Sequence, residues 1–261
     1  MRVFAMKADW DGIWHSNQNV TPHSAIETFT VPTCLPPPPL ACADGGLCAV
    51  GDIGPGGGVV FYVHDDADDL FTSTGSDCGS SCRYLEAAPS DSSAGMDVAA
   101  GDACYTADSD DGNKSCSGAY SVYSNSENQA ASRTTAELFG QGMTNTNKIY
   151  SRATTVGGAA TSTYLAGLAW AYSNNGKTDW FLPSKQELNE LCKYARQQTT
   201  GDTSVACTNS GSVRSGFVFD YYYSSSEASH HNMWIVDMYS GNVGTHGKGP
   251  DGRARFVRAF G

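Results

Sequence analysis

Hydrophobic and polar positions alternate near the C-terminal end of the chain. Residues 234–239, Trp-Ile-Val-Asp-Met-Tyr, follow a period of two, which predicts a β-strand with one set of side chains on each face. We expect one face to be buried and the other to face solvent, the buried set being Trp234, Val236 and Met238 and the exposed set Ile235, Asp237 and Tyr239. The exposed set is chemically mixed, which fits a recognition face. An ordinary half-buried strand with a mixed outer face gives the same pattern.

Other segments predict an α+β fold. Apolar residues recur at helical spacing over 159–172, and Ser184 and Glu187 form a Ser-x-x-Glu capping box that opens a second helix with an apolar face through Ala195. Short strands are predicted at 59–63, 83–87 and 180–182. Helices followed by a string of short strands indicate an α+β arrangement.

A run of four prolines, Pro36–Pro39, marks a domain boundary. Such a run favours a stiff, extended connector. We therefore divide the chain into an N-terminal extension with its connector, 1–48, and a ligand-binding domain, 49–261.

The charge of the chain excludes some partners. The formal net charge is −11, and only 16% of the residues are charged, against about 25% in an average globular protein. Nucleic acid and anionic membrane surfaces would repel such a chain, so we expect neither as a partner. No apolar run approaches a membrane span, and Asp9, Asp11 and His15 stand where a secretory signal would be apolar.

Nine cysteines lie in or beside loops rich in Gly, Ser and Asp. Their short spacings predict local disulfides, and hence an extracellular, cell-surface or virion-surface location. The expected pairs are Cys78–Cys82, Cys104–Cys116 and Cys192–Cys207, while the connectivity of Cys34, Cys42 and Cys48 stays open. Free thiols in a reducing cell are the alternative.

Candidate chemistry is sparse. The acidic stretches at 64–69 and 108–113 fail the spacing of an EF-hand loop and are interpreted as solvated turns. His230, His231 and His246 could form a metal cluster, but chance placement explains them as well. No Ser/His/Asp order or P-loop occurs. We expect no enzyme activity, no cofactor and no metal.

Six motifs in order resemble one known family. They are Gly54-Pro-x-Gly-Gly-x-Val-Phe-Tyr-Val, Tyr84-Leu-Glu-Ala-Ala-Pro, Gly140-x-Gly-x-x-Asn-Thr, Asp179-Trp-Phe-Leu-Pro-Ser-Lys-x-Glu-Leu, Tyr223-Ser-Ser-Ser-Glu and Val257-Arg-Ala-Phe. Together they are similar to the C-terminal domain of the Legionella collagen-like adhesin, over roughly residues 50–261. The resemblance implies a C-type lectin-like fold, in the variant shared with formylglycine-generating enzyme. The calcium-holding motifs of sugar-binding lectins do not occur, nor does any cysteine beyond Cys207 for the enzyme's catalytic pair.

Many members of this group are variable proteins of diversity-generating retroelements, in which adenine mutagenesis rewrites the 3′ end of the gene. The resemblance thus implies a variable region at about 221–256 that binds varied protein targets; a conventional adhesin with a fixed ligand is the alternative. Met233 and Lys248 lie outside the set of residues that mutated Asn codons reach, so we expect them to be fixed. Relatives usually have Trp where this chain has Tyr223.

The candidate residues fall into two groups. The expected ligand contacts are Tyr223, Ala228, Ser229, His230, His231, Asn232, Ile235, Asp237, Tyr239, Ser240, Asn242, Gly244, Thr245, His246, Pro250, Asp251, Gly252, Ala254 and Phe256. The expected scaffold residues are Ser225, Glu227, Trp234, Val236, Met238, Arg258 and Phe260. Tyr, Ser, Gly and Asn dominate antibody loops because they combine rigid aromatic area with adaptable hydrogen bonding.

Overall fold

The computed structural model describes residues 39–64, 70–92, 94–99, 134–156, 159–229, 232–249 and 252–261. The chain divides into two units after Pro38, within the proline run, and the second unit is Pro39–Gly261. Only this second unit is described below. The first 38 residues of the predicted extension lie outside the described residues.

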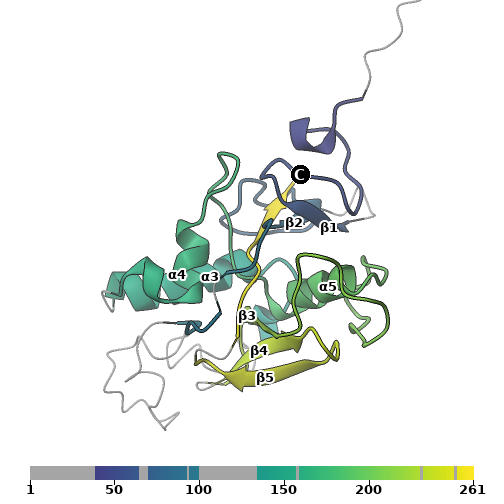
Figure 1. Ribbon diagram of the computed structural model, residues 1–261. Helices are drawn as coiled ribbons and strands as arrows, with labels where there is room; N and C mark the ends of the chain where they lie inside the picture. Colours follow the sequence, from purple (N-terminus) through teal and green to yellow (C-terminus); the bar gives the residue numbers. More distant parts are fainter. Residues whose placement is uncertain are drawn as a thin grey trace, which may run out of the picture. The chain divides into compact units, whose positions relative to one another are not determined.

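The first of two small sheets joins distant parts of the chain. Strands β1 (Val59–Val63), β2 (Tyr84–Ala87) and β6 (Val257–Phe260) pair in the order β1-β2-β6, and both pairings are antiparallel (Figure 1). Both strands predicted at 59–63 and 83–87 are thereby confirmed. β2 lies in the centre and is buried along its whole length, so the chain end is held against residues about 170 positions away.

The second sheet is an antiparallel meander. Strands β3 (Tyr221–Glu227), β4 (Asn232–Asp237) and β5 (Val243–Gly247) follow each other in sequence and in space. β4 is central, and β5 is an edge strand in the described part of the chain. The other edge, β3, is flanked by a short parallel bridge between Tyr222 and Arg253.

Among the described residues, three α-helices pack around the sheets. Helix α5 (Lys185–Ala195) begins at Ser184 with the predicted capping box, in which the side chains and backbone N–H groups of Ser184 and Glu187 bond reciprocally. The helix expected over 159–172 is split: a 3₁₀ turn spans Thr161–Thr163, and α4 covers only Leu165–Ala171. Tyr164 between them is extended, which separates the two pieces.

Helix α3 (Gly142–Tyr150) and the π-helical segment Ser151–Val156 that follows were not predicted. The sequence Gly-Met-Thr-Asn-Thr-Asn contains residues of weak helix propensity, which hide the helix from a local analysis. Two of its polar residues are buried and bonded across the fold: the Asn145 side chain donates to the Ala136 carbonyl at 2.8 Å, and Thr146 receives the Leu182 N–H at 3.0 Å. Tertiary contacts therefore stabilise what local propensity does not.

The segment 180–182 is not a regular strand. Phe181 instead makes an isolated antiparallel bridge with Val257, and all three residues are buried. The prediction was right about burial and wrong about the element, because one bridge partner is not a sheet. With two small sheets and three helices, the fold is α+β as predicted.

In the part of the chain that the structure describes, three disulfides close local loops. Cys78–Cys82 and Cys192–Cys207 are paired as predicted. Cys42, which begins the 3₁₀ turn Cys42–Asp44, pairs with Cys48, settling part of the connectivity left open. Cys34 and the predicted pair Cys104–Cys116 lie outside the described residues. Among the helices of the described ranges, none has both the length and the apolar character of a membrane span.

Candidate ligand-binding surface

The two faces of the β3–β4–β5 sheet pack against different parts of the molecule. Side chains of paired residues lie on the same face, so Tyr222 and Val236 share one face, and Tyr223 and Ile235 share the other. The first face joins a core cluster that includes Leu188 and other residues of α5. The second joins a cluster contributed by α3, α4 and the segment 254–256. The sheet is therefore covered on both sides over its inner half.

Burial on both faces corrects the predicted division of strand β4. Val236 and Met238 are buried and Tyr239 is 71% exposed, as expected. Ile235 is only 5% exposed, which contradicts the prediction that it faces solvent. Trp234 is half-buried instead of fully buried. Its indole N–H donates to Glu137 at 2.8 Å, and the Lys185 ammonium lies 3.3 Å from its ring centroid, so Trp234 covers the start of α5 at the edge of the core.

Four further candidate contacts are also buried, against expectation: Tyr223, Gly252, Ala254 and Phe256. The backbone of 252–256 runs beside β3, where Tyr223 N–H donates to the Arg253 carbonyl at 2.9 Å. The hydroxyl of Tyr223 reaches the carbonyls of Gly247 and Gly249 at 2.5 and 3.0 Å. These residues pack the segment 252–256 against the sheet. A period-two pattern cannot reveal such a long-range contact.

The remaining candidates lie at the two ends of the sheet and along β5, and those at the β4–β5 turn and on β5 form an accessible rim. Tyr239, Asn242 and Thr245 are exposed. Seven more are partly exposed: Ala228, Ser229, Asn232, Asp237, Ser240, Gly244 and His246. His230, His231, Pro250 and Asp251 lie outside the described residues. The structure thus brings the accessible candidates of the β4–β5 turn and of β5 to the outer edge of one sheet, and it places Ala228, Ser229 and Asn232 at the other end of that sheet.

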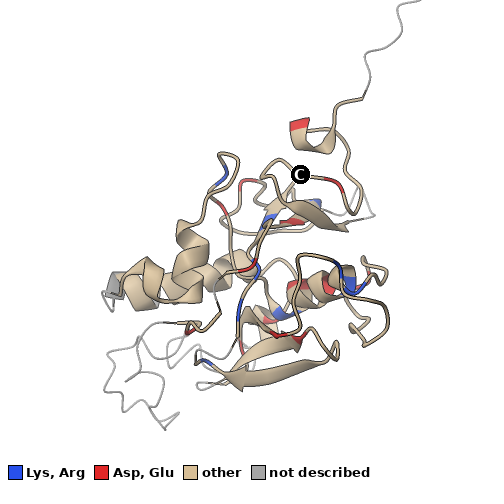
Figure 2. Ribbon diagram, in the orientation of Figure 1, with Lys and Arg blue, Asp and Glu red and all other residues tan. Residues whose placement is uncertain are grey.

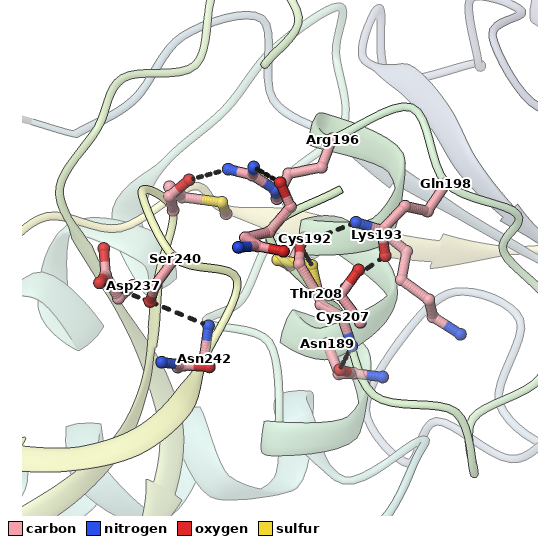
Figure 3. Close-up of a disulfide and its surroundings, with 12 residues drawn as sticks. Asn189, Cys192, Lys193, Arg196, Gln198, Cys207, Thr208, Asp237, Ser240 and Asn242 are labelled. Carbon is pink, nitrogen blue, oxygen red and sulfur yellow. Dashed lines mark hydrogen bonds between the residues drawn. A yellow bond between two sulfur atoms is a disulfide. The ribbon is translucent and has the colours of Figure 1, made fainter. Parts of the chain in front are cut away.

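The β4–β5 turn is held by its own polar side chains (Figure 3). The Asp237 carboxylate accepts the Tyr239 N–H at 2.8 Å and the Ser240 hydroxyl at 2.6 Å. Ser240 in turn accepts the Asn242 N–H at 3.2 Å. Gly241 has a φ of 74°, and an added Cβ would clash with the Thr208 carbonyl, so this position requires glycine. The turn is therefore rigid although its side chains are accessible.

Arg196 fastens this turn to the rest of the molecule. Its buried guanidinium donates to the carbonyls of Met238 and Tyr239 at 2.6 and 3.1 Å. It also donates to the carbonyls of Asn209, Ser210 and Gly211, in the segment that follows Cys207 of the Cys192–Cys207 disulfide. Figure 3 shows Arg196 beside this disulfide. One cation thus ties the turn, the segment after the disulfide and the end of α5 together. Sequence reasoning missed Arg196, because its partners are backbone carbonyls 13 to 43 residues away.

Two residues expected to be fixed within the variable region are buried. Met233 packs in the cluster behind β4. Lys248 is 2% exposed and forms an ion pair with Glu227, which is itself fully buried. A buried charge is tolerated when it is paired, so this ion pair stabilises both groups in the interior.

Apart from the half-buried Trp234, the expected scaffold residues lie in the interior. Ser225 bonds the Pro183 carbonyl through both its N–H and its hydroxyl, at 2.7 and 3.1 Å. Arg258 is buried on β6 and pairs with Glu86, Asp179 and Asp77. Phe260 packs beside Tyr84 with ring centroids 5.1 Å apart.

We call the buried residues that support the candidate surface the frame. Burial shifts the pKa of Glu187 and Tyr222, which belong to it. Burial raises the pKa of Glu187 to about 7, against hydrogen bonds from Ser184 and from backbone N–H groups, which favour its charged form. Burial also raises the pKa of Tyr222, and its hydrogen bond to Asp91 at 2.6 Å adds to the shift. Both groups face the interior, so they belong to the frame.

No group of three His, Cys, Asp or Glu side chains in the described ranges is placed to hold a metal ion. His246 contacts Tyr221 and Tyr223 through its ring. The acidic stretch at 108–113 and residues 65–69 fall outside the described residues.

Comparison with known proteins gives a family match over the part of the chain that contains the candidate surface. Residues 133–258 match the Lcl C-terminal domain. The predicted resemblance to the collagen-like adhesin is therefore confirmed over this range, which contains α3, α4, α5 and β3 to β5. The motifs at 54–63 and 84–89 precede it.

The Lcl C-terminal match and the α+β arrangement identify the fold as C-type lectin-like. A fimbrial protein from Bacteroides ovatus is a structural neighbour, with 18% sequence identity and a TM-score of 0.44 over 78% of this chain. The alignment spans 44% of that protein's length. No curated protein matches the chain.

The Lcl C-terminal match supports a surface ligand-binding domain of the adhesin-like type. The three disulfides fit an extracellular or surface location, since such bonds persist in oxidising environments. Within this domain, the accessible rim of the β4–β5 turn is the candidate ligand-binding surface.

Proposed function

We propose that this is a display protein, which binds protein targets on a cell or other surface through the rim of its β4–β5 turn. Adenine mutagenesis directed by a retroelement diversifies that rim, so that related copies recognise different targets. Binding is the whole function in this proposal, with no catalytic step and no cofactor.

The observation that carries the proposal is the separation of frame and rim. Tyr239 and Asn242 are exposed on a turn whose backbone is fixed by Arg196 and Asp237, and Thr245 is exposed on the adjoining edge strand β5. Side chains on such a turn can change with little effect on stability, since exposed substitutions typically shift it by about 0.5 kcal/mol or less. A diversified surface needs this independence, because most of its variants must still fold.

Two of the residues that mutated Asn codons do not reach, Met233 and Lys248, give independent support. Met233 and Lys248 lie between diversifiable positions in the sequence, yet both are buried in the frame. Lys248 pairs with the buried Glu227, so a change there would remove a cation from beside a buried carboxylate.

A conventional adhesin domain with a fixed ligand is the second candidate. Tyr223, Ile235, Ala254 and Phe256 all belong to the diversifiable set, and all are buried. Free variation at these core positions would destabilise most copies. A fixed sequence would have no such difficulty.

The decisive experiment sequences the genome around the gene. Diversification predicts a nearby near-repeat of the 3′ coding region that differs from it only at adenines. It also predicts that the differences concentrate in the codons of Tyr239, Asn242 and Thr245 and spare those of Met233 and Lys248. The absence of any such repeat, together with identical 3′ ends in sister isolates, would favour the fixed adhesin.

A further inference from the structure

We propose that Phe219, Tyr221 and Tyr239 form an aromatic platform that binds a basic side chain, Lys or Arg, flanked by apolar residues on a protein partner. This inference rests on the proposed ligand-binding function and names the chemistry of the partner. Phe219 and Tyr221 were not among the contacts expected from the sequence.

The platform is continuous with the accessible rim. The rings of Phe219 and Tyr239 meet edge to face with centroids 5.6 Å apart. Tyr221 pairs with Asp237 across the sheet, and its ring lies 5.2 Å from that of His246. Phe219 is 64% exposed and Tyr221 is 38% exposed. Three large rings therefore lie uncovered at the end of the sheet face whose inner half is buried.

The backbone beneath the platform is fixed. The Met238 N–H donates to the Asp220 carbonyl at 3.0 Å, so the segment before β3 stays paired with the segment after β4. Asp220 also receives Arg253 Nε at 2.8 Å, and the Val218 N–H donates to the buried Tyr222 hydroxyl at 3.1 Å. Rings held in place before binding lose little conformational entropy on binding, which is the advantage of rigid aromatic residues in recognition.

The charges around the platform indicate the partner. Asp237 lies beside Tyr221, and its carboxylate oxygens accept only neutral donors, Tyr239 N–H and the Ser240 hydroxyl, among the described residues. Asp220 is already paired with Arg253. Arg196 lies below the turn, buried, with its donors directed at carbonyls. Asp237 is the one charged residue in the sequence of β4, and β5 contains no Lys, Arg, Asp or Glu, as the tan ribbon of β5 in Figure 2 shows.

An ammonium or guanidinium group satisfies both features of this surface. It is attracted to the face of an exposed Tyr or Phe ring, by about 0.5–1 kcal/mol at an exposed site, and to the neighbouring Asp237 carboxylate. The formal charge of −11 on the whole chain attracts a basic partner over a longer range and repels an acidic one. Apolar side chains beside the cation would then cover Phe219 and Tyr239.

The test selects binders from a displayed library of random dodecapeptides, with the full chain as bait. Selected peptides are then measured individually against three proteins: the parent, the platform variant Phe219→Ser/Tyr221→Ser, and the control Trp170→Ser. Trp170 is 44% exposed and stacks on Tyr150, away from the platform, so the control removes a comparable exposed aromatic residue. Circular dichroism and thermal melting establish that both variants fold.

We expect enriched peptides to carry Lys or Arg beside an aromatic or aliphatic residue. Their affinity should fall about tenfold or more for the platform variant and stay unchanged for the control, and it should weaken with added salt. The Asp237→Asn variant of the protein should lose more affinity for the basic peptides than for the same peptides in which Met replaces Lys or Arg.

Three results would overturn the proposal in distinguishable ways. Peptides that bind the platform variant as well as the parent, yet lose binding on Asn242→Ala/Thr245→Ala, would refute the platform and leave the proposed function intact. Enriched peptides that are neutral or acidic would refute the partner chemistry. Peptides that depend on neither set of residues would contradict both the platform and the proposed binding surface.

Discussion

Replacing Ile235 and Tyr239 separately by Ala distinguishes frame from rim within a single strand and its turn. Ile235 is buried between β3 and the α3–α4 layer, and Ile→Ala at such core sites costs about 2–5 kcal/mol. Tyr239 is largely exposed, and its ring touches only Phe219 among the described aromatic residues. An edge-to-face pair contributes about 1 kcal/mol, so Tyr239→Ala should cost no more than that.

Thermal unfolding converts these energies into a measurable difference. For a domain of 150–250 residues, 1 kcal/mol shifts Tm by about 2–4 °C. Ile235→Ala should therefore lower Tm by about 4–20 °C, and Tyr239→Ala by less than about 4 °C. The backbone bonds of residue 239 to Asp237 and Arg196 do not involve the ring, so the Ala variant keeps them. Differential scanning calorimetry of the parent and both variants gives the comparison.

The opposite order would refute the assignment. If Ile235→Ala melts within about 2 °C of the parent while Tyr239→Ala loses more than 10 °C, then Ile235 faces solvent and Tyr239 supports the core. Val236→Ala serves as the matched control, because Val236 is fully buried on the other face of the same strand. It should destabilise in either case, and a failure to do so would mean that the strand itself is misplaced.

Three further substitutions test the frame. The Cys192–Cys207 disulfide closes a loop with a sequence separation of 15, so Cys192→Ala/Cys207→Ala should lower the free energy of unfolding by about 3 kcal/mol, measured by urea denaturation; an unchanged midpoint would contradict this. Arg196→Met leaves several carbonyls without their donor and should cost about 2–4 kcal/mol, with faster amide exchange at Tyr239; unaltered exchange there would show that Arg196 does not hold the turn. Burial raises the pKa of Glu187 to about 7 in the folded state, whereas the side chain loses its proton near pH 4.5 in the unfolded chain. The protonated side chain therefore contributes up to about 3 kcal/mol to the free energy of unfolding at low pH, and this contribution should be lost as the pH rises from 4.5 to 7. Glu187→Gln should flatten that part of the pH–stability profile, and an equal slope in parent and variant would contradict the shift.

Local signals in the sequence predicted the local elements. The strand at 59–63 and the helix that begins at Ser184 could be recognised because a β-rich run and a capping box need only neighbouring residues. The disulfides Cys78–Cys82 and Cys192–Cys207 followed from short spacings in the same way. Helix α3 could not be recognised, because its buried Asn145 and Thr146 are stabilised by partners 9 and 36 residues away.

The candidate surface was predicted in part for the same reason. Alternation separated Val236 from Ile235 correctly, since the two do point to opposite faces of the sheet. Alternation could not show that the face of the sheet that carries Ile235 is covered, because the covering residues come from α3, α4 and the segment 254–256. Phe219 was overlooked because it precedes the alternating segment, and only the contact with Tyr239 brings it to the rim.

A surface that is covered at one end and open at the other limits where diversification can act. Substitutions at Tyr223 or Ile235 change a packed core and carry its energetic cost, whereas those between Tyr239 and Thr245 change a turn whose backbone is held by Arg196 from below. Fixed aromatic rings at Phe219 and Tyr221 border this stretch and do not depend on it for their position, since Asp220 is bonded to both Met238 and Arg253. A binder built in this way keeps the two rings in place while Asp237, Tyr239 and the adjoining turn vary. On this argument, copies that keep an acid at position 237 and an aromatic residue at position 239 should share a preference for basic segments, and copies that lose both should lose that preference.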